Sequence, residues 1–351
     1  MKNLYHIAED VSRASGGVRT VVKDIQTEFP DSKILTTLKN QDDLDIQEFS
    51  KKGPWLYSSS LNKHLNSLNN TSVFHLHGVW MHAQYTAAKI ASKKNIPFVL
   101  SPHGMLEPWL WKDGTLKKKL YFNMVSRSAF AKARYIHAIT PEEQKNLQKL
   151  FPKTEVVCIP NAIEIEEMLE RKEPPRPYFL FLGRIHPKKG LELLIDVFAS
   201  LKTLDFDLKI AGPENAYASQ LKEKVKQLQD SRIEFLGAVR GLEKKQLFRN
   251  AHVFIAPSYS EVVGMVNLEA AMMGTPVITT HQTGLLNEWS HNGGRLINPN
   301  FEELQSVLQE VSKWDLKKRD LNGEHLRNFI IQEYSWKVNK PKWEALYTSM
   351  R

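Results

Sequence analysis

The chain has 351 residues, of which 42% are hydrophobic and 25% are charged; this composition excludes a disordered or fibrous protein, and the length suggests two domains. The formal net charge of +9 favours an anionic partner, and the single cysteine, Cys158, excludes an intramolecular disulfide and a four-cysteine zinc site. The opening residues, MKNLYHIAED, lack the apolar core of a signal peptide, and no run reaches the ~20 apolar residues of a membrane span, so we expect a cytoplasmic protein.

Short apolar runs rich in β-branched and aromatic residues alternate with longer segments of helical periodicity. The strands predicted in the first half are residues 4–7, 34–38, 73–76, 98–100, 135–138 and 156–159. Those predicted in the second half are residues 178–182, 208–210, 233–236, 253–256, 277–279 and 295–297. Helices are predicted between many of them, for example over residues 18–28, 116–132, 192–202 and 221–229. This alternation predicts parallel sheets covered by helices, and so many strands favour two sheets over one.

A domain boundary follows the last strand of the first half. Pro160-Asn161 ends that strand, and the charged, proline-rich run 164–177 lacks the pattern of a buried element. We therefore predict a first domain of residues 1–163, a linker of residues 164–177 and a second domain of residues 178–334. Residues 335–351 are expected to form a helix that returns to the first domain.

Two glutamates mark the strongest candidate site, in the stretch SYSEVVGMVNLEAAMMGTPVITT. Glu261 follows the predicted strand 253–256, and Glu269 lies eight residues later in a helix of small residues that ends at Gly274. Ligands of open parallel sheets bind at the carboxyl ends of the strands, where a helix N-terminus presents free N–H groups to phosphate. The two carboxylates could bind sugar hydroxyls, although their spacing alone equally allows ordinary loop and helix glutamates.

A basic turn follows the first strand of the second domain, in the stretch FLFLGRIHPKKGLELL. Arg184 and Lys189 both lie beyond the carboxyl end of that strand. A guanidinium group and an ammonium group at this place suit a pyrophosphate. The alternative is a solvated basic turn without a ligand.

Metal-binding patterns are present, but their context is wrong. The triplets Asp43-Leu44-Asp45 and Asp205-Phe206-Asp207 do not follow an apolar strand, as a metal-binding Asp-x-Asp motif normally does. A group of histidines in the first half lacks the carboxylate or cysteine that would complete a zinc site. These histidines are His75, His77, His82 and His103. We therefore expect no metal site.

Most of the excess positive charge lies between residues 85 and 135. There, the stretch from Trp109 to Tyr121 combines tryptophans and leucines with Lys112 and the run Lys117–Lys119. This mixture suits an anionic membrane surface or a lipid-linked acceptor, and the alternative is a solvated helix face beside core tryptophans. Nucleic acid would fit the charge, but the chain has no recognisable binding motif for it, so we expect no such partner.

Taken together and in this order, these stretches resemble the retaining glycosyltransferases of family 4. The family has a Gly-Gly loop after its first strand, a Pro-Asn hinge, a strand–Gly-Arg–turn–Lys-Gly element and an E-x7-E motif. The matching positions are Gly16-Gly17, Pro160-Asn161, Gly183-Arg184, Lys189-Gly190, and Glu261 with Glu269. The resemblance covers nearly the whole chain. It implies the GT-B fold, in which two Rossmann-like, doubly wound α/β domains face each other across a cleft.

The resemblance also implies a role for each matching residue. Glu269 would bind the ribose of a nucleotide, and Glu261 would bind the donor sugar. Arg184 and Lys189 would neutralise the departing diphosphate. His103, in the stretch SPHGM, has the place of a first-domain histidine that faces the donor sugar. The catalytic residues are thus expected to be Arg184, Lys189, Glu261 and His103. The donor-binding positions are expected to be Gly16, Gly17, Gly183, Gly212, Pro213, Val239, Arg240, Val263, Gly264, Met265 and Glu269.

Two positions depart from the family pattern. The family often has Gly or Pro followed by Phe after the first glutamate of its motif, where this chain has Val262-Val263. The last glycine of the family's hinge is Ala162 here. Since the residues after the first glutamate line the sugar pocket, the resemblance does not identify the sugar.

The function implied is a retaining sugar transfer that needs no metal or other cofactor. The donor would be a nucleotide-diphosphate sugar, and the acceptor a hydroxyl of a lipid-linked or polysaccharide-precursor glycan. One alternative is a GT-B enzyme that processes a nucleotide sugar without transferring it to a glycan, as an epimerase does. Another is a non-catalytic relative that binds a nucleotide sugar. The basic segment adds the expectation of peripheral attachment to the inner face of a membrane.

Overall fold

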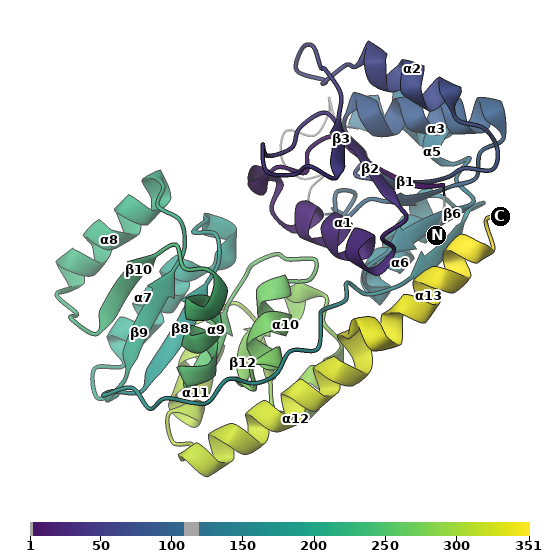
Figure 1. The fold of residues 1–351 in the computed structure, drawn as a ribbon. Helices are drawn as coiled ribbons and strands as arrows, with labels where there is room; N and C mark the ends of the chain where they lie inside the picture. Colours follow the sequence, from purple (N-terminus) through teal and green to yellow (C-terminus); the bar gives the residue numbers. More distant parts are fainter. Residues whose placement is uncertain (1–2, 109–118) are drawn as a thin grey trace. The chain divides into compact units, whose positions relative to one another are not determined.

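The computed structural model describes residues 3–108 and 119–351, which form two compact units (Figure 1). The first unit comprises residues 1–161 and 339–351, and the second comprises residues 162–338. The sequence predicts the end of the first domain at residue 163 and the start of the returning helix at residue 335. Each unit contains one parallel sheet with helices packed on it, so the predicted α/β class is confirmed. Each of the twelve predicted strands overlaps an observed strand.

The first unit contains a seven-stranded parallel sheet with strand order β3-β2-β1-β4-β5-β6-β7. Its strands are β1 (Leu4–Ala8), β2 (Lys33–Thr36), β3 (Ile46–Glu48), β4 (Val73–His77), β5 (Phe98–Ser101), β6 (Tyr135–Ala138) and β7 (Glu155–Cys158). Every residue of β1, β4, β5 and β6 is buried, as expected for strands covered on both faces. The edge strand β3 was not predicted, because Ile46 is its only buried residue and the surrounding run is polar.

Helices cover both faces of this first sheet. They are α1 (Gly17–Glu28), α2 (Ser59–Ser67), α3 (His82–Lys94), α5 (Arg127–Phe130), α6 (Pro141–Leu150) and, from Asn339 onward, α13 (Trp336–Thr348). Figure 1 shows α2 beside α3. Lys340 of α13 joins Glu28 at the end of α1 through an ion pair of 2.9 Å. The last helix is therefore part of the first unit's packing, although the chain reaches it from the second unit.

The second unit contains a six-stranded parallel sheet with strand order β10-β9-β8-β11-β12-β13. Its strands are β8 (Tyr178–Leu182), β9 (Asp207–Ala211), β10 (Ile233–Gly237), β11 (Val253–Ala256), β12 (Val277–Thr280) and β13 (Arg295–Ile297). Its helices are α7 (Leu191–Ser200), α8 (Ala216–Leu228), α9 (Gly241–Asn250), α10 (Met265–Met272), α11 (Phe301–Val311) and α12 (Leu316–Tyr334). The buried strands β8 and β11 lie side by side at its centre.

Both sheets reverse their direction of winding at one place. In the first unit this place lies between β1 and β4, and in the second it lies between β8 and β11. Loops leave neighbouring strands in opposite directions there, which opens a crevice at the carboxyl edge of the sheet. Functional residues are therefore expected at the carboxyl edge of each sheet.

The predicted linker, residues 164–177, has no helix or strand and belongs to the second unit. Arg249 Nε of α9 donates to the Leu169 carbonyl at 2.9 Å, and Arg327 Nη2 of α12 donates to the Glu166 carbonyl at 2.7 Å. The linker is therefore held against α9 and α12 and is not a free tether.

Candidate functional site

The predicted donor-binding residues of the second unit gather at the carboxyl edge of its sheet. Gly183 follows β8, Gly212-Pro213 follows β9, and Val239-Arg240 lies between β10 and α9. Glu261 lies between β11 and α10, and Gly264 is the N-cap of α10. Because β8, β9, β10 and β11 are neighbours in the sheet, these loops meet at one rim. The structure thus brings together residues that are far apart in the chain, from Gly183 to Gly264.

Two glycines allow the loops of this rim to touch. A Cβ atom on Gly190 would lie 2.1 Å from the Pro257 carbonyl oxygen, and the φ of Gly190 is +67°. A Cβ atom on Gly212 would lie 2.3 Å from the Gly183 carbonyl oxygen. Neither contact leaves room for a side chain. Glycine at position 190 therefore lets the basic turn pack directly on the loop that carries Glu261.

This packing brings together Lys189 and Glu261, two of the candidate catalytic residues. The Nζ atom of Lys189 contacts Oε2 of Glu261 in an ion pair, and both side chains are largely shielded from solvent, with 13% and 20% exposed. The backbone supports the pair, since Tyr259 N donates to the Lys188 carbonyl at 2.8 Å. Arg184 is exposed, and its guanidinium has no carboxylate partner among the described residues. Lys189 is thus a paired cation of this rim, and Arg184 is a cation without a carboxylate partner in the part of the chain that the structure describes.

Burial lowers the pKa of Lys189 to about 8, and the positive charges of Lys188 and Arg184 act in the same direction. The ion pair with Glu261 opposes this shift. Since the folded pKa lies below that of an unfolded lysine, the folded state loses this proton first as the pH rises. Folding is therefore favoured by rising pH between about 8 and 10.5, while the positive charge at the rim is lost over the same interval.

This titration predicts the pH dependence of anion binding. The dissociation constant of a nucleoside diphosphate should increase above pH 8, by up to about tenfold per pH unit, because one proton must then be taken up on binding. Calorimetric titrations with UDP, GDP and ADP between pH 6.5 and 9.5 measure it. Lys189→Arg is the control, since a guanidinium stays charged throughout. An equally steep dependence in Lys189→Arg would show that another group titrates.

Glu269 faces a different set of groups from Glu261. It lies on α10, and its Oε2 atom is 2.5 Å from Nζ of Lys244 on α9. Both residues line a cavity of about 180 Å³ together with Phe248 and Met272. Lys245 lines the same cavity but pairs with Glu166, at 2.6 Å. Lys244 was not among the predicted site residues.

The start of α10 lies between the two glutamates of the motif. Val263 is buried, and Gly264 caps the helix without a side-chain hydrogen bond. A Cβ atom on Gly264 would lie 2.8 Å from Nδ2 of Asn267, so a side chain there would require Asn267 to shift. Asn267 N donates to the Gly264 carbonyl at 2.8 Å, which leaves the N–H groups of Met265 and Val266 as those that a helix start offers to an anion.

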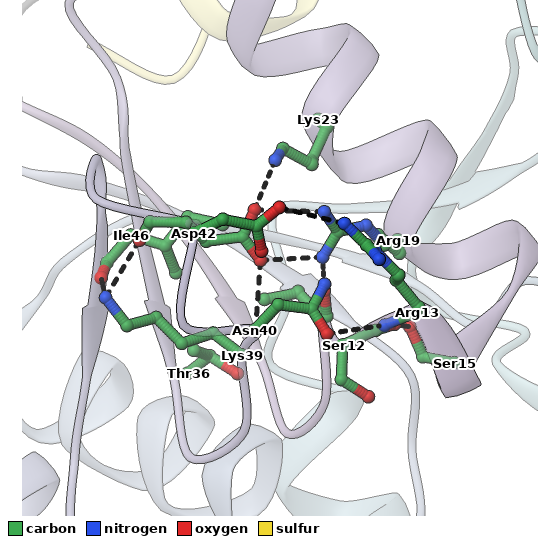
Figure 2. Close-up of polar contacts among 12 residues, drawn as sticks. Ser12, Arg13, Ser15, Arg19, Lys23, Thr36, Lys39, Asn40, Asp42 and Ile46 are labelled. Atoms are coloured by element: carbon green, nitrogen blue, oxygen red, sulfur yellow. Dashed lines mark hydrogen bonds and ion pairs between the residues drawn. The ribbon is translucent and has the colours of Figure 1, made fainter. Parts of the chain in front are cut away.

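The Gly-Gly loop of the first unit has space around it. Gly16 has a φ of +62° and precedes α1, and a Cβ atom on Gly16 or Gly17 would meet no other atom within 4 Å. Arg19 and Lys23 extend from α1 beside this loop (Figure 2). Both bind the buried carboxylate of Asp43, Arg19 at 2.7 and 2.9 Å and Lys23 at 2.6 Å. Hydrogen bonds from Arg19 above all hold the pKa of Asp43 well below its usual range.

The two Asp-x-Asp triplets are already engaged by cations. Asp43 binds Arg19 and Lys23, as described above. In the second unit, Arg176 binds Asp205 at 2.8 Å and Asp207 at 3.3 Å. These contacts explain Asp43, Asp205 and Asp207 as parts of the structure. They leave the expectation of a metal-free site untested.

The four histidines considered as zinc ligands do not form one group. His82 begins α3 and contacts Trp55 and Tyr57, away from the others. His75 and His77 of β4 instead adjoin His6 of β1, and ring nitrogens of these three buried residues lie within 4.8 Å of one another. His6 was not considered, because its proximity depends on the register that places it opposite His75.

His103 lies at the carboxyl edge of the first sheet, immediately beyond β5. It has a φ of +52°, in the left-handed region that residues other than glycine seldom adopt. Its Nε2 atom is 2.9 Å from Nδ1 of His77. The predicted first-domain histidine is thus at the same edge as Gly16 and is held in an unusual conformation.

Much of the predicted membrane-facing stretch lies outside the described residues, since residues 109–118 are not among them. At its described end, the hydroxyl of Tyr121 accepts a hydrogen bond from Nε1 of Trp55 at 3.1 Å. Across the part of the chain that the structure describes, no helix combines the length and apolar character needed to cross a bilayer.

Two parallel sheets with a switch point in each, and a charged rim at the carboxyl edge of the second, agree with the predicted GT-B class of fold. Residues 164–327 match the model of glycosyl transferases group 1, and residues 46–167 match that of glycosyltransferase family 4. The two matches together span residues 46–327, and the chain belongs to this glycosyltransferase family. The predicted family membership is thus confirmed, as is the predicted Rossmann-like α/β architecture of each unit.

Individual relatives are more distant. The phosphatidylinositol N-acetylglucosaminyltransferase gpi3 subunit of Schizosaccharomyces pombe is 28% identical over 60% of this chain and 47% of its own length. The O-antigen chain mannosyltransferase RfbU of Salmonella typhimurium is 23% identical over 59% of each chain. The match thus spans about half the length of these curated relatives. The structure of Anabaena HepE in complex with UDP has a TM-score of 0.79, with 17% identity over 99% of this chain and 100% of that one.

Proposed function

We propose that the protein is a retaining, metal-independent glycosyltransferase that moves a sugar from a nucleotide-diphosphate sugar to a hydroxyl acceptor. The observation that carries the proposal is the arrangement of Lys189, Glu261 and Arg184 at the rim beside the free start of α10. This rim offers cations and N–H groups for a diphosphate, together with a carboxylate for sugar hydroxyls.

The residues of the rim have separable tasks in such a reaction. Cleavage of the donor leaves additional negative charge on the diphosphate, which Lys189 and Arg184 stabilise without rearrangement of solvent. Glu261 neutralises Lys189 before the donor binds and then offers its carboxylate to sugar hydroxyls. Glu269 binds the ribose from α10. The acceptor's proton passes to the departing phosphate oxygen, so the protein needs no carboxylate nucleophile.

The acceptor is proposed to be a lipid-linked or polysaccharide-precursor glycan. The names of two relatives support this class, since one belongs to a phosphatidylinositol-modifying enzyme and the other to a transferase of O-antigen chains. The basic residues between positions 85 and 135 would favour a phosphorylated acceptor at the cytoplasmic face of an anionic membrane. A tryptophan-containing stretch from Trp109 to Tyr121 would add apolar contact.

The test is a panel of UDP-, GDP- and ADP-sugars. The correct donor at 100 times its Kd should stabilise the fold by ~2.7 kcal/mol in thermal unfolding. Release of nucleoside diphosphate is then measured with and without a membrane or glycan extract, and with EDTA. Acceptor-dependent release that survives EDTA is the expected result. Loss of turnover with EDTA and its recovery with Mn²⁺ or Mg²⁺ would overturn the metal-free mechanism.

The same panel separates the alternatives. A nucleotide-sugar-processing enzyme would convert the donor without an acceptor, and the sugar product would remain attached to nucleotide. A non-catalytic relative would be stabilised by a donor but would release no diphosphate under any condition. If no nucleotide sugar stabilised the protein, the proposed donor class would be wrong.

A further inference from the structure

A row of hydrogen bonds beneath α13 has its proton positions fixed by one carbonyl group. Nε2 of His137 lies 2.8 Å from the Ile159 carbonyl oxygen, which can only accept, so His137 carries its proton on Nε2. Its bare Nδ1 must then accept from the Ser101 hydroxyl, at 2.8 Å. Ser101 in turn accepts from Nε2 of His75 at 2.6 Å, and Nδ1 of His75 accepts from the Tyr347 hydroxyl at 2.8 Å. Every polar atom of this row is satisfied.

A second row runs from the sheet interior to His103. Nδ1 of His6 lies 3.0 Å from Nε2 of His77, and Nδ1 of His77 lies 2.9 Å from Nε2 of His103. The far atom of the row, Nε2 of His6, is buried and has no hydrogen-bond partner. The near atom, Nδ1 of His103, makes no hydrogen bond with any described residue, and the residue is partly exposed. The row therefore ends in a closed interior on one side and at a partly exposed ring on the other.

The unpartnered nitrogen of His6 decides the direction of hydrogen-bond donation along this row. If His103 donated to His77 and His77 donated to His6, Nε2 of His6 would be a buried N–H group without an acceptor. If His6 donates to His77 and His77 donates to His103, Nε2 of His6 is a bare nitrogen. By analogy with the backbone, a buried N–H group without an acceptor is the rarer defect. The outward direction is therefore favoured, and it places the proton of His103 on Nδ1.

The rings of this row are neutral at physiological pH. Burial lowers the pKa of His6 and of His103 to about 3, and burial also lowers that of His77 well below its usual value. Each ring then carries one proton, so a donor at one end of a bond forces an acceptor at the other. The position of the proton on the His6 ring therefore determines the position of the proton on the His103 ring.

The backbone of His103 is held from the opposite side by Glu143. Oε1 of Glu143 accepts from Gly104 N at 2.7 Å, and Oε2 accepts from Ile139 N at 2.8 Å. Glu143 is 2% exposed and follows Thr140, which caps α6. Its carboxylate thus ties the loop after β5 to the loop after β6. This tie, with the contact to His77, sustains the left-handed conformation of His103.

We propose that His77 and Glu143 are positioning residues, which hold His103 as a neutral ring with its proton on Nδ1, so that it presents an N–H donor at the carboxyl edge of the first sheet; the family resemblance implies a donor sugar as the group that accepts from it. The substrate named here rests on the proposed function. A ring fixed in this way donates a hydrogen bond and does not act as a base. This role agrees with a mechanism in which the departing phosphate takes the acceptor's proton.

The first test needs no substrate. Long-range ¹H–¹⁵N spectra of histidine-labelled protein distinguish a protonated ring nitrogen from a bare one, and comparison with His103→Gln assigns the His103 signals. We expect the proton on Nδ1 in the wild type. In His77→Leu the two nitrogens should shift toward intermediate values, because nothing then selects one tautomer. A wild-type proton on Nε2, or unchanged His103 signals in His77→Leu, would overturn the proposal.

The second test compares variants of similar bulk by steady-state kinetics with the donor that the panel identifies. His77→Asn keeps an N–H donor near the place of Nδ1, whereas His77→Leu does not. We expect kcat to fall by up to about 100-fold in His77→Leu and in Glu143→Gln, and by much less in His77→Asn. The Kd of the nucleoside diphosphate should not change, since the second unit holds it.

Glu142→Gln is the matched control for Glu143→Gln. Its carboxylate is on the same turn, is 69% exposed, and lies 3.9 Å from Lys145. We expect wild-type kinetics from it. Equal losses in His77→Asn and His77→Leu would show that His77 matters only as packing, and would overturn the proposal. If the wild type bound no nucleotide sugar, the proposed function would fail, while the spectra would still decide the tautomer of His103.

Discussion

Replacing Lys189 by methionine is expected to lower kcat by about 100- to 1000-fold, the range found when one oriented electrostatic donor is removed from an active site. Methionine keeps most of the buried length of the side chain and removes only the charge. The diphosphate would then depart without the ammonium group that is paired with Glu261, while the cations of Arg184 and Lys188 remain on the basic turn. Single-turnover measurements with the identified donor isolate the chemical step from product release.

Lys188→Met is the matched control, since it removes the adjacent lysine from the same turn. Because the carboxylate of Glu261 is paired with Lys189, the loss of Lys188 should change kcat by less than about tenfold, the scale of about 1.4 kcal/mol. Turnover near the wild-type level in Lys189→Met would exclude Lys189 from charge stabilisation. An equal loss in both variants would indicate damage to the turn and not the removal of a specific charge.

The ion pair of Lys189 with Glu261 leads to a specific prediction for the variant Glu261→Ala. Glu261→Ala removes the counter-charge of Lys189, so binding of a nucleoside diphosphate should be retained, whereas the preference among donor sugars should be lost. The double variant with Lys189→Met should show a coupling energy of about 0.5–3 kcal/mol in kcat/KM, because the two side chains are in contact. Additive losses would mean that the pair does not act as a unit.

The parts of this site that could be predicted from the sequence are those fixed by local order. Glu261 had to lie at the carboxyl edge, because a buried apolar strand precedes it and a helix follows. Arg184 had to lie at the same edge for the same reason. The contact between Lys189 and Glu261 could not be predicted, since it depends on the close approach of Gly190 to the Pro257 carbonyl. Nothing in the sequence near either residue specifies that approach.

Lys244 shows a second limit of the sequence. It stands beside Lys245 on α9, and no local pattern tells the two lysines apart. In the structure Lys244 pairs with Glu269, whereas Lys245 pairs with Glu166 of the predicted linker. The difference arises because Lys244 reaches a residue of α10, whereas Lys245 reaches the predicted linker, which has no regular secondary structure. Similarly, His6 joined His75 only through the register of β1 and β4.

The second large effect is expected at Glu269. Glu269→Ala should weaken binding of a nucleoside diphosphate by about 1–3 kcal/mol, because ribose hydroxyls would lose a charged hydrogen-bond acceptor and Lys244 would lose its partner. Isothermal titration with nucleoside diphosphates measures the loss directly. The proposed contact of Glu269 with the ribose can be tested directly, since 2′-deoxy and 3′-deoxy analogues each remove one of the ribose hydroxyls.

In the wild type we expect each deoxy analogue to bind less tightly than the parent nucleotide, and in Glu269→Ala this difference should disappear. Lys244→Met should cause a smaller loss than Glu269→Ala, because the carboxylate remains but is no longer oriented by the ammonium group. Lys245→Met is the matched control, as it borders the same 180 Å³ cavity and pairs with Glu166 instead. If Glu269→Ala still discriminated between the parent and both deoxy analogues, the ribose would have to be bound by other groups, and Glu269 would be left as the structural partner of Lys244.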